Sequence, residues 1–357
     1  MLSTSLRPHS IVAITHASDI AAARRAGHAL AQQVGFDEVR AGQLALLISE
    51  AATNIIKHAS DGRIYLSATL GERAGVDIVA VDSGPGISNM AQALRDGVSS
   101  VGTAGTGLGA MRRLADEFDA YAPRERGAVF FMRLWRAADT CGQSPALAAL
   151  PALFTFGALS LPIAGEDANG DAWAIAADRA GIALLSVDGL GHGELAAEAA
   201  KAALDCMAGG PFRPPAAQLE ACHGALRASR GAALAAMTLS YPGAGGRPDP
   251  NGDASLRFAG IGNIAACLMG QDKRRQMVSH NGIVGHNLRK VQEFEHPCAA
   301  GSIFIMHSDG ISTQWDLAAH PGLAACHPLV IAAVLLRDYA RVRDDASVLV
   351  LRFGGQP

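Results

Sequence analysis

Apolar positions in the first third of the chain recur at helical spacing in two segments. The first begins at Asp19, a residue type that suits a helix N-cap, and keeps apolar side chains on one face as far as residue 34. The second covers residues 37–59 and carries a stripe of leucine and isoleucine. The apolar runs that predict strands lie near residues 10–15, over 76–81 and over 129–135. This mixture predicts an α/β domain at the N-terminus.

The second half of the chain is dominated by apolar runs that predict strands, over residues 153–161, 181–187, 301–308 and 348–352. Upstream of them the chain is rich in Ala, Gly, Ser and Pro, so we place a linker at 137–152 between domains of residues 1–136 and 153–357. Residues 145–165 contain no charged side chain, but three prolines would interrupt a membrane-spanning helix. We therefore expect no membrane segment.

Composition narrows the class of protein. The 357 residues suffice for two domains that each bury a core, with 49% hydrophobic and 18% charged residues. A formal net charge of −3 provides no basic surface for nucleic acid. The six cysteines show no Cys-x-x-Cys spacing, so we expect neither a zinc ribbon nor a disulfide scaffold. Together with the lack of a signal-peptide pattern, this predicts a cytoplasmic protein.

Polar residues on the second predicted helix are spaced to project from one side. Glu50 and Asn54 are four residues apart, and Lys57 and His58 follow one turn later, away from the leucine stripe. Such a row can hold a carboxylate, an amide oxygen and a cation over a triphosphate and its magnesium ion. The alternative interpretation is a solvated polar face.

Two glycine-containing segments follow this helix. Asp82 ends a predicted strand, where it can accept the exocyclic amine of adenine, and Gly84 and Gly86 behind it let the backbone approach a flat ligand. The second segment precedes a helix predicted over residues 110–118, whose N-terminal amides suit phosphate. It contains Gly105, Thr106, Gly107, Leu108 and Gly109. The three elements in this order predict an ATP site more strongly than a glycine run alone.

At these residues the chain resembles the GHKL ATPases, and among them the RsbT-type and anti-sigma-factor serine kinases, over about residues 8–135. The resemblance implies a Bergerat α/β sandwich with ATP and Mg²⁺ as cofactors. It implies Asn54 as the magnesium ligand and Glu50 as the base that activates an acceptor hydroxyl. Asp82 with Gly86 would recognise adenine, and a phosphate lid would contain Gly105, Gly107 and Gly109.

Four aspartates in the second half stand next to predicted apolar strands. They are Asp171, Asp188, Asp309 and Asp344. Oxygen ligands without His or Cys suit Mg²⁺ or Mn²⁺, and a water bridging two such ions can become a hydroxide that attacks phosphorus. For any single Asp-Gly pair the alternative is a turn, and we assign Gly252-Asp253 to a loop.

This half resembles the SpoIIE/RsbX branch of the metal-dependent (PPM) serine/threonine phosphatases, from about residue 153 to 354. The resemblance rests on Asp188-Gly-Leu-Gly-His-Gly-Glu194, Ala259-Gly-Ile-Gly-Asn263 and Arg343-Asp-Asp-Ala-Ser. It implies an α-β-β-α sandwich that binds two Mn²⁺ or Mg²⁺ ions, with Asp344 preferred over Asp345. The implied metal contacts are Asp171, Asp188, the Gly189 carbonyl, Asp309 and Asp344. His192, between two glycines, either contacts phosphate or caps the next helix.

Together the two resemblances imply an α/β (α+β) bifunctional partner-switching regulator. It would phosphorylate and dephosphorylate Ser or Thr of a STAS-domain antagonist protein in bacterial stress or sigma-factor signalling. A sigma factor or downstream effector is a further candidate partner, and a homodimer is compatible with the sequence. The alternative is a phosphatase whose N-terminal domain only binds nucleotide or sequesters a partner.

Overall fold

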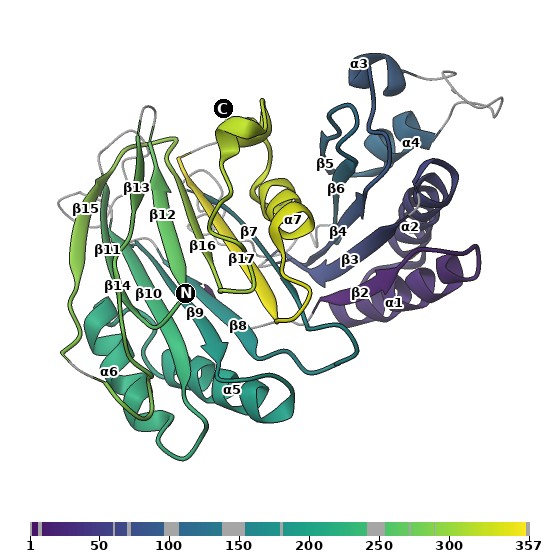
Figure 1. Cartoon of the computed structure of the whole chain (residues 1–357). Coiled ribbons are helices and arrows are strands. Elements are labelled where there is room, and N and C mark those ends of the chain that lie inside the picture. The colour runs from purple at the N-terminus through teal and green to yellow at the C-terminus, as the bar shows by residue number, and fades with distance from the viewer. Residues whose placement is uncertain are drawn as a thin grey trace. The chain divides into compact units, whose positions relative to one another are not determined.

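The chain forms two compact units, each described here by itself (Figure 1). The N-terminal unit comprises Arg7–Gly142 and His320–Val334, and the C-terminal unit comprises Met1–Leu6, Gln143–Ala319 and Leu335–Pro357. The computed structural model describes residues 2–5, 9–59, 61–69, 73–95, 107–137, 154–178, 181–240, 254–270, 273–288 and 290–354.

The N-terminal unit is a five-stranded antiparallel sheet of order β2-β3-β4-β6-β5, with helices α1 and α2 packed on it (Figure 1). Its elements are β2 (Ser10–Ala13), α1 (Asp19–Val34), α2 (Glu38–His58), β3 (Gly62–Ala68), β4 (Gly75–Asp82), α3 (Met90–Ala93), α4 (Gly107–Leu114), β5 (Glu117–Tyr121) and β6 (Ala128–Trp135). The core lies between the helices and the sheet, where the predicted apolar stripes meet the inward faces of β3, β4 and β6.

Local chemistry sets the ends of the two long helices. Asp37 caps α2 by accepting the backbone N–H of Arg40 at 2.7 Å, and Gly35 ends α1 in the left-handed conformation at φ 73°. The predicted N-cap at Asp19 is wrong, because Ser18 occupies that position. The Asp19 carboxylate instead accepts the N–H groups of Thr15 and His16, which lower its pKa to about 2.

The C-terminal unit contains two sheets. The first has the order β1-β8-β9-β10-β11-β14 with β15 also paired to β11, and the second has the order β13-β12-β16-β17-β7. Helices α5 and α6 pack on the first sheet (Figure 1). The bounds are β1 (Leu2–Ser5), β7 (Phe154–Leu161), β8 (Asp171–Ala177), β9 (Gly181–Gly189), α5 (Glu194–Ala208), α6 (Pro215–Ala225), β10 (Ala232–Ser240), β11 (Ala254–Ile261), β12 (Ala265–Met269), β13 (Arg274–Gln276), β14 (Ser279–His280), β15 (Phe294–Cys298), β16 (Ile303–His307), η2 (Leu317–Ala319) and β17 (Ala346–Phe353). Of the remaining elements, η3 (Leu323–Ala325) and α7 (Pro328–Tyr339) as far as Val334 belong to the N-terminal unit.

The two sheets of the C-terminal unit face each other. Aromatic pairs join them, with ring centroids 5.3 Å apart for Phe156 and Trp173 and 6.4 Å apart for Phe258 and Phe304. A second core lies between the first sheet and helices α5 and α6. This layering places the ends of β8, β9, β16 and β17, on which the candidate metal residues stand, in one unit.

Each unit incorporates a segment that is distant in sequence. Strand β1 pairs antiparallel with β8, from Leu2 opposite Ala177 to Ser5 opposite Ala174. In the N-terminal unit, the ring of His327 stacks on Phe131 with centroids 4.0 Å apart. The domain limits 1–136 and 153–357 remain a prediction. The C-terminal unit also includes Met1–Leu6, and the N-terminal unit also includes His320–Val334.

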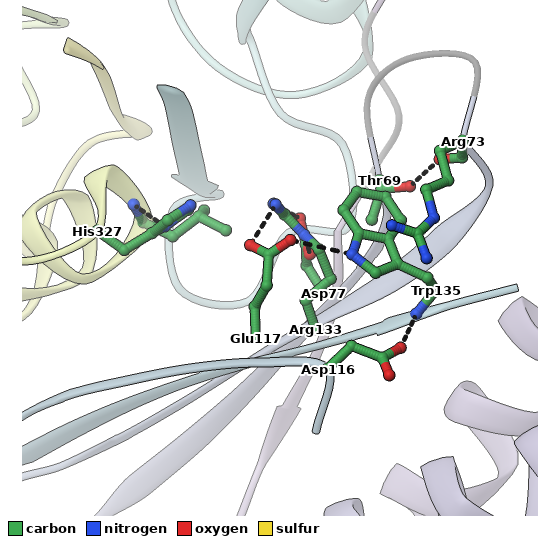
Figure 2. A network of polar contacts seen from close by, with 9 residues as sticks. Thr69, Arg73, Asp77, Asp116, Glu117, Arg133, Trp135 and His327 are labelled. Atoms are coloured by element: carbon green, nitrogen blue, oxygen red, sulfur yellow. Dashed lines mark hydrogen bonds and ion pairs between the residues drawn. The ribbon is translucent and has the colours of Figure 1, made fainter. Parts of the chain in front are cut away.

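A polar network lies on the N-terminal sheet near His327 (Figure 2). The Arg133 guanidinium donates to the carboxylate of Asp77 on β4 and, at 3.1 Å, to that of Glu117 on β5. The Trp135 indole N–H also donates to Glu117, at 3.0 Å. These contacts tie three strands together. No helix within the described ranges is long and apolar enough to cross a membrane.

Candidate functional site

Helix α2 presents the polar row of the N-terminal unit at the start of α4. Glu50 and Asn54 are half-buried, whereas Lys57 and His58 are exposed. A Cβ on Gly107, the first residue of α4, would lie 3.4 Å from both Asn54 Oδ1 and Glu50 Oε2. Within the described residues, Nδ2 of Asn54 is buried and makes no hydrogen bond. The structure therefore brings Glu50, Asn54 and the N-terminus of α4 together, a donor set that fits a magnesium-bound phosphate.

The turn after β4 is built around Asp82. Its Oδ1 accepts the backbone N–H of Gly84 at 2.8 Å and of Ala128 at 3.1 Å. A Cβ on Gly84 would lie 2.7 Å from the His58 carbonyl oxygen, so glycine allows the turn to approach the end of α2. Gly86 has φ 69°, and a Cβ there would lie 2.1 Å from the carbonyl oxygen of Pro123. Gly84 thus lies beside the C-terminal end of α2, whereas Gly86 packs against Pro123.

The second glycine segment is placed differently from the prediction. Gly107, Leu108 and Gly109 form the first turn of α4, and the helix predicted over residues 110–118 is wrong at both ends because β5 already begins at Glu117. Gly105 and Thr106 lie outside the described residues.

The aspartates of the C-terminal unit meet at neighbouring strand ends. Asp171 begins β8 and lies directly opposite Asp188 near the end of antiparallel β9, which places their side chains on one face, with about 4.5–5.5 Å between Cβ atoms. Asp309 follows β16, and Asp344 precedes β17, whose start pairs with the end of β16. Each sheet therefore supplies two carboxylates.

Burial and mutual repulsion shift the acidity of this cluster. Burial, with the charges of Asp345 and Asp309, raises the pKa of Asp171 to about 7. Burial, with the charges of Asp171, Asp309 and Asp344, raises the pKa of Asp188 to about 9. The pKa of Asp344 is raised too, by burial and then by Asp309. These effects show that the four side chains lie within electrostatic reach of one another.

The donor set suits hard cations. Oδ2 of Asp171 and Oδ2 of Asp188 are buried, and neither makes a hydrogen bond to the part of the chain that the structure describes. Buried carboxylate oxygens that repel one another are stabilised by a divalent cation. In the described ranges, no group of three or more His, Cys, Asp or Glu side chains is placed to hold a metal ion. Carboxylate oxygens nevertheless suit Mg²⁺ or Mn²⁺ ions that keep several waters.

Gly189 and Asp344 are the remaining predicted ligands, and Asp345 is the neighbour of Asp344. Gly189 is buried, and its N–H donates to the Gly170 carbonyl at 3.0 Å. Asp345 is engaged by the backbone, since its two oxygens accept the N–H groups of Ile163 and Gly170, both at 2.7 Å. Asp344 is half-buried, and the charge of Asp309 contributes to its raised pKa. The geometry is thus compatible with Asp344 as the ligand and Asp345 as a structural anchor.

Three residues near the cluster were not assigned a site role from the sequence. Asn263 donates its side-chain amide to Asp309, and its place in the Gly-Ile-Gly-Asn263 motif is a signal that could have indicated it. Ser308, fully buried, opposes the effect of burial on the pKa of Asp171 by hydrogen bonding. Glu166 contacts His192, and no sequence spacing points to that pair.

Comparisons with known proteins assign the N-terminal unit to a family. Residues 15–134 match the family of histidine kinase-like ATPase domains. The serine/threonine-protein kinase RsbT of Bacillus subtilis (strain 168) is 37% identical over 114 residues, covering 32% of this chain and 86% of that protein.

Solved structures match a larger share of the chain. A structure described as "The bacterial stressosome: a modular system that has been adapted to control secondary messenger signaling" is 26% identical, with a TM-score of 0.50, and covers 56% of this chain and 99% of its own. RsbX in complex with magnesium is 20% identical, with a TM-score of 0.48, over 57% of this chain and 96% of its own. The predicted fold class and the RsbT-like ATPase unit are confirmed.

Proposed function

Because the chain belongs, through residues 15–134, to the family of histidine kinase-like ATPase domains, we propose that it is a phosphorylation switch with two opposed activities. The N-terminal unit transfers the γ-phosphate of ATP to a serine or threonine of a partner protein. The C-terminal unit hydrolyses the resulting phosphoester. The strongest support for this proposal is that four aspartates, from both sheets of the C-terminal unit, lie near one another.

In the C-terminal unit, the residues proposed to hold two Mn²⁺ or Mg²⁺ ions are Asp171, Asp188, the Gly189 carbonyl, Asp309 and Asp344. Such ions, when bound, lower the pKa of a bridging water and stabilise charge on phosphorus. Asn263 orients Asp309 through its amide, and Asp345 fixes the backbone beside Asp344. These contacts of Asn263 and Asp345 hold the carboxylates in place for metal binding.

In the N-terminal unit, Glu50 is proposed to accept the proton of the partner's hydroxyl as it attacks the γ-phosphate. Asn54 contributes its side-chain oxygen to the magnesium ion of ATP, and Asp82 accepts the adenine amine. The proximity of Gly107 to both Glu50 and Asn54 supports this arrangement, because the N-terminal amides of α4 then lie beside the phosphates.

The proposed substrate is a STAS-domain antagonist protein, with a sigma factor or downstream effector beyond it. This follows from the likeness to RsbT and to a structure that concerns the stressosome. Two opposed activities on one residue would only hydrolyse ATP if both were always on. A signal must therefore favour one unit at a time.

The phosphatase half is tested with a phosphoserine peptide and Mn²⁺. We expect metal-dependent phosphate release that Asp188→Ala reduces by roughly 100-fold or more, as for removal of one preorganised group in an active site. The control is Asp205→Ala, which removes a carboxylate of the same unit from the exposed face of α5 and should leave the rate unchanged. Undiminished hydrolysis by Asp188→Ala would contradict the assignment.

A further inference from the structure

Two loops of the C-terminal unit meet beside the aspartate cluster. One spans residues 163–170, between β7 and β8, and both its ends are tied to Asp345 through the N–H groups of Ile163 and Gly170. The other spans residues 190–193 and directly follows Asp188 and Gly189. Since Asp345 adjoins Asp344 and the second loop adjoins Asp188, both loops are fixed to the backbone that carries the proposed metal ligands.

A carboxylate and an imidazole join these loops. Oε1 of Glu166 lies 2.5 Å from Nδ1 of His192, with the glutamate side chain 29% and the histidine 58% exposed. With this exposure, the imidazole of His192 is not a buried structural group and is open to a ligand. The short contact fixes the ring through Nδ1.

The backbone around His192 is shaped for this contact. Gly193 has φ 76°, and a Cβ there would lie 2.9 Å from Oε2 of Glu166. Gly191 has φ 84°, and a Cβ there would lie 3.1 Å from Nη1 of Arg230. Two left-handed glycines therefore let His192 sit between a carboxylate on one side and a guanidinium on the other.

We propose that His192, positioned by Glu166, is the proton donor of the phosphatase reaction. This inference rests on the proposed phosphatase function. As the oxygen of a water molecule bonds to phosphorus and the bond from phosphorus to the seryl oxygen breaks, the imidazolium Nε2–H passes its proton to that oxygen. Serine leaves as the neutral alcohol, phosphate retains the water oxygen with one of its protons, the other proton passes to solvent, and the neutral imidazole regains a proton from solvent.

Glu166 is then a positioning residue. Its carboxylate holds the Nδ1–H and stabilises the imidazolium, as carboxylates do for other catalytic histidines. Another charged group beside this turn is Arg230, from the loop before β10.

The leaving group distinguishes proton donation from a structural role. A seryl oxygen needs a proton to leave, whereas p-nitrophenolate leaves as a stable anion. With Mn²⁺ present, we expect His192→Gln to lower the rate on a phosphoserine peptide by about 100-fold or more and the rate on p-nitrophenyl phosphate by at most a few-fold. Glu166→Gln should lower the phosphoserine rate by about tenfold and move the alkaline limb of its pH profile to lower pH.

Matched controls are His286→Gln, an exposed histidine of the same unit, and Asp167→Asn, the exposed neighbour of Glu166. Neither should change the ratio of the two rates. Equal losses on both substrates, or no loss, in His192→Gln would overturn this inference alone. Absence of metal-dependent hydrolysis of both substrates by the unsubstituted chain would overturn the proposed phosphatase function and this inference with it.

Discussion

The two candidate sites of this molecule are assembled in opposite ways. In the C-terminal unit, four aspartates that are far apart in sequence are delivered by strand ends of two sheets, and two of them are buried enough that their pKa values rise to about 7 and about 9. In the N-terminal unit, Glu50 and Asn54 lie one turn apart on α2, and the first residue of α4 lies beside both. In the C-terminal site, a bound cation would relieve the repulsion between carboxylates. In the N-terminal site, the polar groups are half-buried and open to a ligand. Metal should therefore affect stability as well as activity in the first site.

The largest expected effect separates two adjacent aspartates. Asp344→Asn should reduce metal-dependent phosphoserine hydrolysis by roughly 100-fold or more while leaving the melting temperature of the metal-free protein unchanged or higher, since it removes a repelling charge. Asp345→Asn should instead lower stability by about 1–3 kcal/mol, because its new amide cannot accept both backbone N–H groups as the carboxylate does. Denaturant titration and kinetics of both variants measure this contrast. Interchanged phenotypes would show that the ligand and the anchor are assigned in the wrong order.

An intermediate effect concerns pH and metal. A carboxyl group whose pKa is raised in the folded state contributes stability that is fully present below its unfolded pKa and is lost as the pH rises through the folded value, about 7 for Asp171 and about 9 for Asp188. The metal-free protein should thus lose several degrees of melting temperature between about pH 5 and about pH 9.

Calorimetry with and without Mg²⁺ measures this loss. Magnesium should restore stability most at high pH and release protons on binding. Asp188→Asn, which lacks one of the titrating groups, serves as the comparison and should show a flatter profile. A melting temperature that rises over this pH range without metal would contradict the burial of the cluster.

The smallest effect concerns the glycines of the ATP-side turn. Gly86→Ala should cost at least about 1–2 kcal/mol, because a left-handed residue acquires a Cβ that also overlaps the Pro123 carbonyl. Gly42→Ala on α2, where a Cβ meets no atom within 4 Å, should stabilise by about 0.5–1 kcal/mol. Chemical denaturation gives both values. Equal effects at the two positions would remove the argument that Gly86 is required by the turn.

Much of the local structure followed from the sequence. The helix predicted over residues 37–59 is Glu38–His58, and the strands predicted over 76–81 and 129–135 are Gly75–Asp82 and Ala128–Trp135. Amphipathic stripes and buried apolar runs are local signals, so they suffice for such elements. The strand positions also predicted that the aspartates stand at strand ends.

Features that depend on distant contacts were not predictable. Strand β1 forms only because Leu2–Ser5 finds an edge at β8, and Ser308 and Glu166 gain their roles from neighbours across the fold. The first turn of α4 extends back to Gly107, beside Glu50 and Asn54 of α2, although glycine is a poor helix former. In each case tertiary packing outweighed the local pattern.

The most direct test of two opposed activities uses labelled ATP, a STAS-domain partner protein and a chain carrying Asp171→Ala and Asp309→Ala. We predict that phosphorylated partner accumulates with this variant and disappears when unsubstituted protein and Mn²⁺ are added. Adding Glu50→Gln to the variant should abolish the labelling while nucleotide binding persists. No labelled partner with the phosphatase-deficient variant would contradict the account and leave the N-terminal unit as a nucleotide-binding module.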